Sequence, residues 1–153
     1  MPYLIDGHNL IPKLGLRLDS PDDEMQLVGL LGEFARLSRH PVHVYFDGAP
    51  AGHAGAQRFA RVTAHFVRAG STADEAIKAE LRRLAGAARN WIVVTSDRVV
   101  QNEARAAHAR VMSSEEFAGR FRQLQEKQAE RGADAPLKPE DVRDWLKLFG
   151  GDE

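Results

Sequence analysis

Five short apolar runs, rich in β-branched and aromatic residues, alternate with longer amphipathic stretches along most of the chain. The runs have the length and composition of strands and lie at residues 3–5, 42–46, 62–67, 91–95 and 109–112. The stretches at 24–38, 72–88 and 98–107 repeat apolar residues at helical spacing. Alternating helices and strands predict an α/β layer fold with a mainly parallel central sheet.

The length of the chain fits one domain with a core of its own. The 153 residues are 43% hydrophobic and 28% charged, so a core can form without disulfide or metal staples. We expect a single domain over 1–153, with an α/β core to about residue 113 and a helical extension over about 114–153. Helices are expected at 114–130 and 139–149, and the Gly-rich segment 49–57 is expected to be a mobile loop.

Several classes of function are excluded by what the sequence lacks. With no Cys, the chain cannot use thiolate nucleophiles, Cys-ligated zinc or iron–sulfur clusters. It has no G-x-G-x-x-G or P-loop motif, no G-x-S-x-G nucleophile and no H-E-x-x-H zinc pair. The first residues do not form a basic segment followed by a long apolar run, so we expect a cytoplasmic protein with no membrane partner.

Aspartates follow three of the predicted strands. Asp6, Asp47 and Asp97 each stand where an apolar run ends. Because the carboxyl ends of parallel strands share one edge of a sheet, these side chains are expected to converge there if their strands are neighbours. A fourth carboxylate, Asp74, opens the helix that precedes the run at 91–95.

Each aspartate also has a purely structural explanation. Asp-Gly is a common turn, Asp97 fits a helix N-cap, and Thr72 with Glu75 fits a capping box. As a group, however, unpaired carboxylates repel one another and raise each other's pKa unless a cation neutralises them. Oxygen ligands suit Mg²⁺ or Mn²⁺, which can activate water for phosphodiester cleavage. We therefore hypothesise hydrolytic nuclease chemistry.

Two polar residues follow the first aspartate. His8 could contact substrate or transfer a proton, and Asn9 could hydrogen-bond Asp6 or a phosphate, with turn stabilisation as the alternative. His43 and His65 lie inside predicted strands and are interpreted as packing residues.

The run YLIDGHNLI at 3–11 resembles the opening D-G-x-N signature of the NYN branch of PIN-like nucleases. VYFDG at 44–48, STAD at 71–74 and VVTSD at 93–97 resemble, in order, the acidic motifs of the YacP-like subgroup. The resemblance covers roughly residues 3–113 and is looser in the C-terminal helices. Position 8 departs from it, with His where the subgroup often has Tyr.

The resemblance implies a PIN-like three-layer fold and a metal-dependent endoribonuclease that uses Mg²⁺ or Mn²⁺ on single-stranded RNA, in some members associated with ribosomes. Carried over by position, Asp6, Asp74 and Asp97 would be catalytic metal ligands. Asp47 would be an auxiliary ligand and Asn9 would orient Asp6 or the scissile phosphate. Glu75 could take the place of Asp74 as ligand.

Cations near the predicted site suggest contacts with RNA phosphates. Arg58 and Arg61 follow the Gly-rich segment after Asp47, and Arg98 is next to Asp97. Such contacts would position RNA without reading its sequence. Because the net charge is −1, any basic surface must be local.

Two other functions remain open. One is a non-catalytic RNA- or ribosome-binding module that keeps the fold and the acids. The other is a small Mg²⁺-dependent phosphatase or signalling domain.

Overall fold

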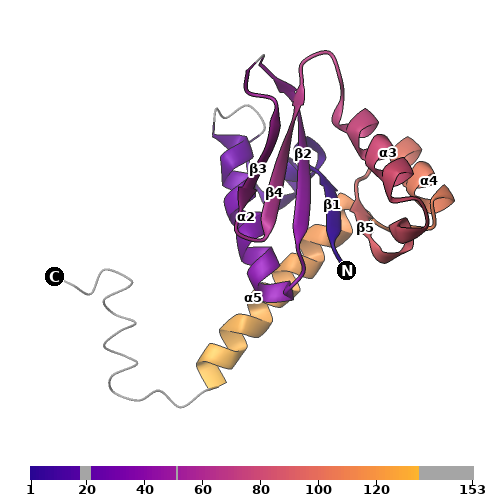
Figure 1. Ribbon diagram of the computed structural model, residues 1–153. Helices are drawn as coiled ribbons and strands as arrows, with labels where there is room; N and C mark the ends of the chain where they lie inside the picture. The colour runs from indigo at the N-terminus through magenta and orange to yellow at the C-terminus, as the bar shows by residue number, and fades with distance from the viewer. Residues whose placement is uncertain (18–21, 51, 135–153) are drawn as a thin grey trace.

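The computed structural model describes residues 1–17, 22–50 and 52–134, and within these ranges six strands form one sheet (Figure 1). The strands lie in the order β3-β4-β2-β1-β5-β6. Their bounds are β1 (Tyr3–Asp6), β2 (Val42–Ala49), β3 (Gly55–Phe59), β4 (Val62–Arg68), β5 (Ile92–Val94) and β6 (Arg110–Met112). All neighbouring strands are parallel except β3 and β4, so the prediction of a mainly parallel sheet is confirmed.

Helices cover both faces of this sheet. They are α1 (Gly7–Leu10), η1 (Ile11–Leu14), α2 (Asp23–Ser38), α3 (Ala73–Leu84), η2 (Ala85–Asn90), α4 (Arg98–Ala106) and α5 (Ser114–Asp134). Figure 1 shows α2 and α5 on one side and α3 and α4 on the other. The three-layer α/β prediction is therefore confirmed. No helix in the described ranges has both the length and the hydropathy that crossing a membrane requires.

Because helices cover both faces of the sheet, both faces are buried. Successive side chains of each strand point to opposite sides, so each inner strand of the sheet contributes to two cores. Tyr3 and Ile5 pack toward α2 and α5, where Tyr3 meets the rings of Phe34 and Phe117. Leu4, between them, packs with Ile77 in the core under α3 and α4. Two cores thus hold β1 at the centre of the molecule.

Two expectations from the sequence were wrong. The segment expected to be a loop at 49–57 instead ends β2 at Ala49 and begins β3 at Gly55. Gly, Ala and Gln are weak strand formers, but pairing along β4 overrides that local preference. The helix expected over 72–88 ends at Leu84, because Ala85 takes a positive φ of 48° and a 3₁₀ turn follows. The predicted helix at 139–149 lies outside the described residues.

Candidate active site

The parallel strands bring three of the predicted acids to one edge, which we call the carboxyl edge. Asp6 is the last residue of β1, between β2 and β5, and its side chain is buried with 8% exposure. Asp47 lies near the end of the neighbouring β2, and Asp97 follows β5. The N-terminus of α3 adds Asp74. We call Asp6, Asp74 and Asp97 the carboxylate cluster.

Asp74 links the other two members of the carboxylate cluster. Its side chain hydrogen-bonds to both Asp6 and Asp97. Burial and then the charge of Asp97 raise the pKa of Asp74, while Lys78, one helical turn later, lowers it. Asp74 therefore lies close to both of the other carboxyl groups and connects them.

The pKa of Asp6 is also raised. Its burial, followed by the charge of Asp74, raises its pKa from 3.8 to about 6. The backbone N–H of Asn9 and the charge of His8 act in the opposite direction, and Asp47 raises the pKa further. At neutral pH the cluster therefore carries negative charge that the protein compensates poorly.

The donor set fits a hard divalent cation. Asp74 interacts with Asp6 on one side and with Asp97 on the other, and a divalent ion can neutralise the charge of such carboxylates. Among the described residues, no three His, Asp or Glu side chains already enclose one ion position. The roles of these residues as ligands stay predictions.

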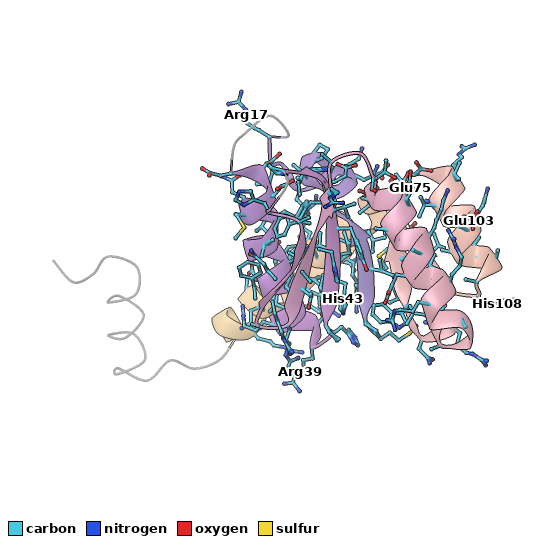
Figure 2. All side chains as sticks on the ribbon, turned by 45° about the horizontal axis from the view of Figure 1, so that its top comes forward. Arg17, Arg39, His43, Glu75, Glu103 and His108 are labelled. Atoms are coloured by element: carbon cyan, nitrogen blue, oxygen red, sulfur yellow. The ribbon has the colours of Figure 1, made fainter. Side chains whose placement is uncertain are left out.

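The structure separates the neighbouring acids Asp74 and Glu75. Glu75 is exposed near the top of α3 in Figure 2, and its backbone N–H donates to the Thr72 hydroxyl at 3.1 Å. The predicted N-cap is thus present. Asp74 is the residue that contacts the other carboxyl groups, so the geometry favours Asp74 over Glu75.

Asp97 is the N-cap of α4, as the sequence suggested. Its Oδ1 accepts from the backbone N–H groups of Val99 and Val100, which caps α4. Its own N–H donates to the buried hydroxyl of Thr95, at the end of the strand segment. Capping fixes the position of a carboxyl group that Asp74 also contacts.

His8 bridges two carboxylates. Its Nδ1 lies 2.9 Å from Asp47 Oδ1 and its Nε2 lies 2.8 Å from Glu24 Oε2. One oxygen of Asp47 is thereby engaged by His8. The sequence analysis missed Glu24, because nothing in the sequence indicates that the start of α2 returns to position 8.

We expect His8 and Glu24 to be energetically coupled. In a double-mutant cycle of His8→Gln and Glu24→Gln, each single change should lower the free energy of unfolding. The double variant should lose about 1 kcal/mol less than the sum, because either change alone already breaks the same half-exposed bond. Urea unfolding at pH 6 measures the cycle. Additive losses would show that the bridge contributes nothing.

Asn9 positions the site from the inside of the protein. Its Oδ1 accepts from the Ser96 backbone N–H at 2.8 Å and from the hydroxyl of the buried Ser114. Its backbone N–H hydrogen-bonds to Asp6. The side chain therefore joins α1, the loop after β5 and the start of α5. The predicted effect on Asp6 is exerted through the backbone.

Asn9→Ala is expected to lower the free energy of unfolding by about 2 kcal/mol, because it leaves the partly buried N–H of Ser96 and the Ser114 hydroxyl without this acceptor. Urea unfolding measures the change. Asn102→Ala is the matched control, since Asn102 is exposed on α4. Equal losses in the two variants would contradict the assigned role.

Arg58 and Arg61 do not reach the carboxylate cluster, which corrects the expectation from the sequence. The Arg61 carbonyl accepts from the N–H of Val42, the first residue of β2, at the opposite edge of the sheet. Arg58 Nε donates to the Ala60 carbonyl in the same turn. β3 runs away from the carboxyl edge, so Arg58 on β3 and Arg61 in the turn after it lie toward the opposite edge. Figure 2 shows Arg39, which lines one pocket together with Arg61, and Glu75 at opposite ends of the molecule.

Arg98 keeps the position that the sequence suggested. It is exposed, begins α4 and follows Asp97 directly. Its role toward RNA stays a prediction.

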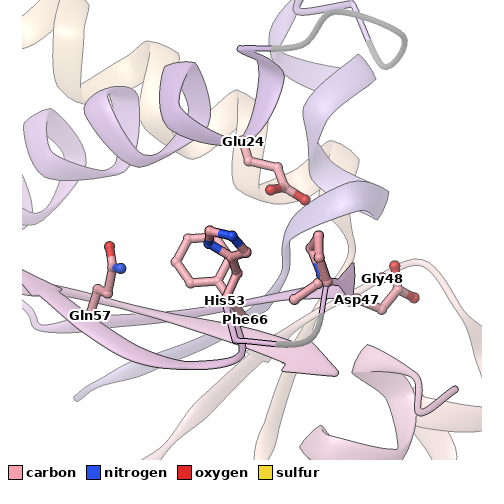
Figure 3. A pocket seen from close by; sticks show the side chains of 8 residues that line it. Glu24, Asp47, Gly48, His53, Gln57 and Phe66 are labelled. Carbon is pink, nitrogen blue, oxygen red and sulfur yellow. The ribbon is translucent and has the colours of Figure 1, made fainter. Parts of the chain in front are cut away.

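A pocket of about 360 Å³ lies at the end of β2 (Figure 3). It shares Asp47 and Glu24 with the His8 bridge. The end of β2, the loop after it and the facing strands supply the other walls. The lining residues are Glu24, Asp47, Gly48, Ala49, Pro50, His53, Gln57 and Phe66.

Comparisons with known proteins agree with this architecture. A crystal structure of Rae1 (YacP) from Bacillus subtilis is 23% identical, with a TM-score of 0.68 over 99% of this chain and 84% of that chain. A tryptophan-to-leucine mutant of the same protein is 25% identical, with a TM-score of 0.70 over 99% of this chain and 96% of that one. No curated protein sequence matches the chain.

The family model described as the YacP-like NYN domain matches residues 3–147. This range contains every member of the carboxylate cluster, and the match confirms the resemblance that the acidic motifs carried. The NYN domains are a family of nucleases. The chain therefore belongs to the YacP-like NYN domain family.

Proposed function

We propose that this protein is a Mg²⁺- or Mn²⁺-dependent endoribonuclease that cleaves single-stranded RNA. The observation that carries the proposal is Asp74 hydrogen-bonded between Asp6 and Asp97 at the carboxyl edge. A cluster of acids at the carboxyl end of a parallel sheet is suited to a divalent ion and a phosphodiester. Membership in a nuclease family supports the same chemistry.

Asp6, Asp74 and Asp97 would hold the ion. When bound, such an ion supplies charge stabilisation for the phosphate and lowers the pKa of a coordinated water. Asp6 is fixed by β1 and by the Asn9 N–H, so it offers a rigid ligand. Asp74 lies between Asp6 and Asp97, so it would complete the set of ligands and help to orient the attacking water. Arg98 would contact a flanking phosphate.

We also propose that the RNA can be bound to a ribosome when it is cleaved. The reason is that the acidic motifs resemble the YacP-like subgroup, some members of which are associated with ribosomes. Contacts to phosphates do not read the base sequence, so in this setting the ribosome would select the RNA that is cleaved.

The test is cleavage of a mixed-sequence circular single-stranded RNA in Mn²⁺, Mg²⁺ or EDTA. Linearisation of a circle requires an internal cut, which separates an endonuclease from an exonuclease. We expect cleavage with either ion and none in EDTA. Asp74→Asn should abolish cleavage, whereas Glu75→Gln, the adjacent exposed acid, should retain it.

Two other measurements on the same protein, RNA binding and turnover of a phosphomonoester, can decide against the proposal. RNA binding that is undiminished in EDTA, without cleavage in any metal, would indicate a binding module. Turnover of a phosphomonoester with the RNA circle left intact would indicate a phosphatase.

A further inference from the structure

The pocket at the end of β2 has the properties of a nucleobase site. Its volume of about 360 Å³ falls in the range of sites for small molecules. Its lining includes Asp47, whose charge acts on Asp6 of the cluster, so a group bound there would lie on the same side of the sheet as a phosphodiester at the cluster (Figure 3). We call it the side pocket and define it by Glu24, Asp47, Gly48, His53, Gln57 and Phe66.

An aromatic ring forms one wall of the side pocket. Phe66, on β4, is half-buried and packs against Phe46 with ring centroids 5.6 Å apart and planes 25° apart. This backing holds the ring in place. Gly55, directly across from Phe66 on β3, has no side chain, and a Cβ built there would meet nothing within 4 Å. The ring therefore borders open space in which a flat base could stack.

The polar residues that line the side pocket determine which nucleobases it can hydrogen-bond. Glu24 and Asp47 place two carboxyl groups in the lining, and the His8 ring lies between them. Carboxylate oxygens accept from the amino and imino groups of bases. Gln57, exposed on β3, can both donate and accept, and His53 enters from the loop between β2 and β3.

We propose that the side pocket binds the nucleobase next to the scissile phosphate, stacked on Phe66 with its amino-bearing edge toward Glu24 and Asp47. The inference rests on the proposed function and adds a base preference to it. Guanine, adenine and cytosine carry an exocyclic amino group and uracil does not. The pocket thus favours cleavage beside an amino-bearing base.

Binding is tested without any metal, so that it does not depend on cleavage. A trinucleotide with a central 2-aminopurine is titrated with protein in EDTA, and stacking is followed as loss of fluorescence. Phe66→Leu keeps an apolar side chain but removes the ring, and it should weaken binding about tenfold. Phe59→Leu is the matched control, because Phe59 also packs half-buried against the core but does not line the pocket.

Gln57→Ala should weaken binding about fivefold, and because Gln57 is exposed on β3 this variant should fold normally. Circular dichroism checks the fold of each variant. Binding by Phe66→Leu and Gln57→Ala that equals binding by the wild type and by Phe59→Leu would overturn the proposal.

Cleavage provides the second arm. Two RNAs that differ by cytidine or uridine beside one cleavage site are compared by kcat/KM. The wild type should prefer cytidine about tenfold, and Phe66→Leu and Gln57→Ala should reduce this preference to about twofold. An unchanged preference in both variants would overturn the proposal. If the wild type cleaves no RNA, the proposed function fails, and the fluorescence titration alone decides whether the pocket binds a base.

Discussion

Replacing Asp6 with asparagine is expected to abolish RNA cleavage and, at the same time, to stabilise the metal-free protein. Asp6 is buried beside Asp74 and Asp47, and its pKa is raised to about 6. At pH 7 the folded protein must therefore keep the carboxylate of Asp6 ionised although it is buried and close to other carboxyl groups. Asparagine has a similar shape and no charge. It removes that penalty together with a predicted metal ligand.

The sign of the pH dependence follows from the raised pKa. Between pH 3.8 and about 6 the folded state binds more protons at Asp6 than the unfolded state does. The contribution of Asp6 to the free energy of unfolding therefore falls as the pH rises through this window. Integrated to pH 7, the penalty is at most about 3 kcal/mol, and we expect Asp6→Asn to recover about 1–3 kcal/mol.

Urea unfolding in EDTA from pH 4 to pH 8 measures this effect, and RNA cleavage in Mn²⁺ measures the loss of function. The advantage of Asp6→Asn should be small at pH 4 and largest above pH 7. Glu75→Gln controls for removal of an exposed charge at the same edge. An Asp6→Asn protein that is less stable than the wild type at pH 7 would contradict the electrostatic account.

Gly7→Ala is expected to cost about 3 kcal/mol of stability and to impair cleavage. A Cβ at position 7 would lie 2.9 Å from the Tyr45 carbonyl oxygen and closer still to the ring of Phe46. Neither neighbour can yield cheaply, because Phe46 is fully buried and Tyr45 belongs to β2. Relief of the clash would move β1 away from β2. Asp6 would move with it.

Gly29→Ala is the matched control for this change. Gly29 lies in α2 with nothing within 4 Å of a built Cβ, so alanine there should stabilise the protein by about 0.5–1 kcal/mol. Urea unfolding compares the two variants, and cleavage rates are measured on the folded fraction. If Gly7→Ala is as stable as the wild type, close packing does not explain the glycine after Asp6.

The sequence contains much of the information that positions the carboxylate cluster. Asp6 and Asp97 follow apolar runs, and parallel pairing of β1 with β5 is enough to bring them together. Asp74 needs one further condition, that the turn before α3 returns its N-terminus to the same edge. No local pattern specifies that turn. The structure meets the condition.

The positions of Arg58 and Arg61 could not be predicted from local sequence patterns. The glycines and alanines before Arg58 indicate a loop, and a loop after Asp47 could have carried both arginines to the site. Instead, Gly55 to Phe59 pair with β4 and run toward the opposite edge. The same pairing places Gln57 and Gly55 around Phe66 and thereby forms the side pocket. Pairing between strands, rather than propensity, decides this region.

Contacts between segments that are distant in the chain could not be predicted from the sequence either. Glu24 reaches His8 across 16 positions, and Asn9 reaches Ser114 across 105. Both contacts depend on how helices dock on the sheet, and a single sequence does not encode that docking in any short motif. Lys78 is different, because its spacing of one helical turn from Asp74 is visible in the sequence.

The measurement that tests the central claim most directly is Mn²⁺ binding, followed by electron paramagnetic resonance of the free ion, beside RNA cleavage at the same Mn²⁺ concentrations. We predict that the wild type binds Mn²⁺ over the range in which cleavage appears. Asp74→Asn should lose both binding and cleavage, and Glu75→Gln should keep both. Cleavage that persists in Asp74→Asn, or Mn²⁺ binding unaffected by that change, would contradict a metal-dependent nuclease site at the carboxylate cluster.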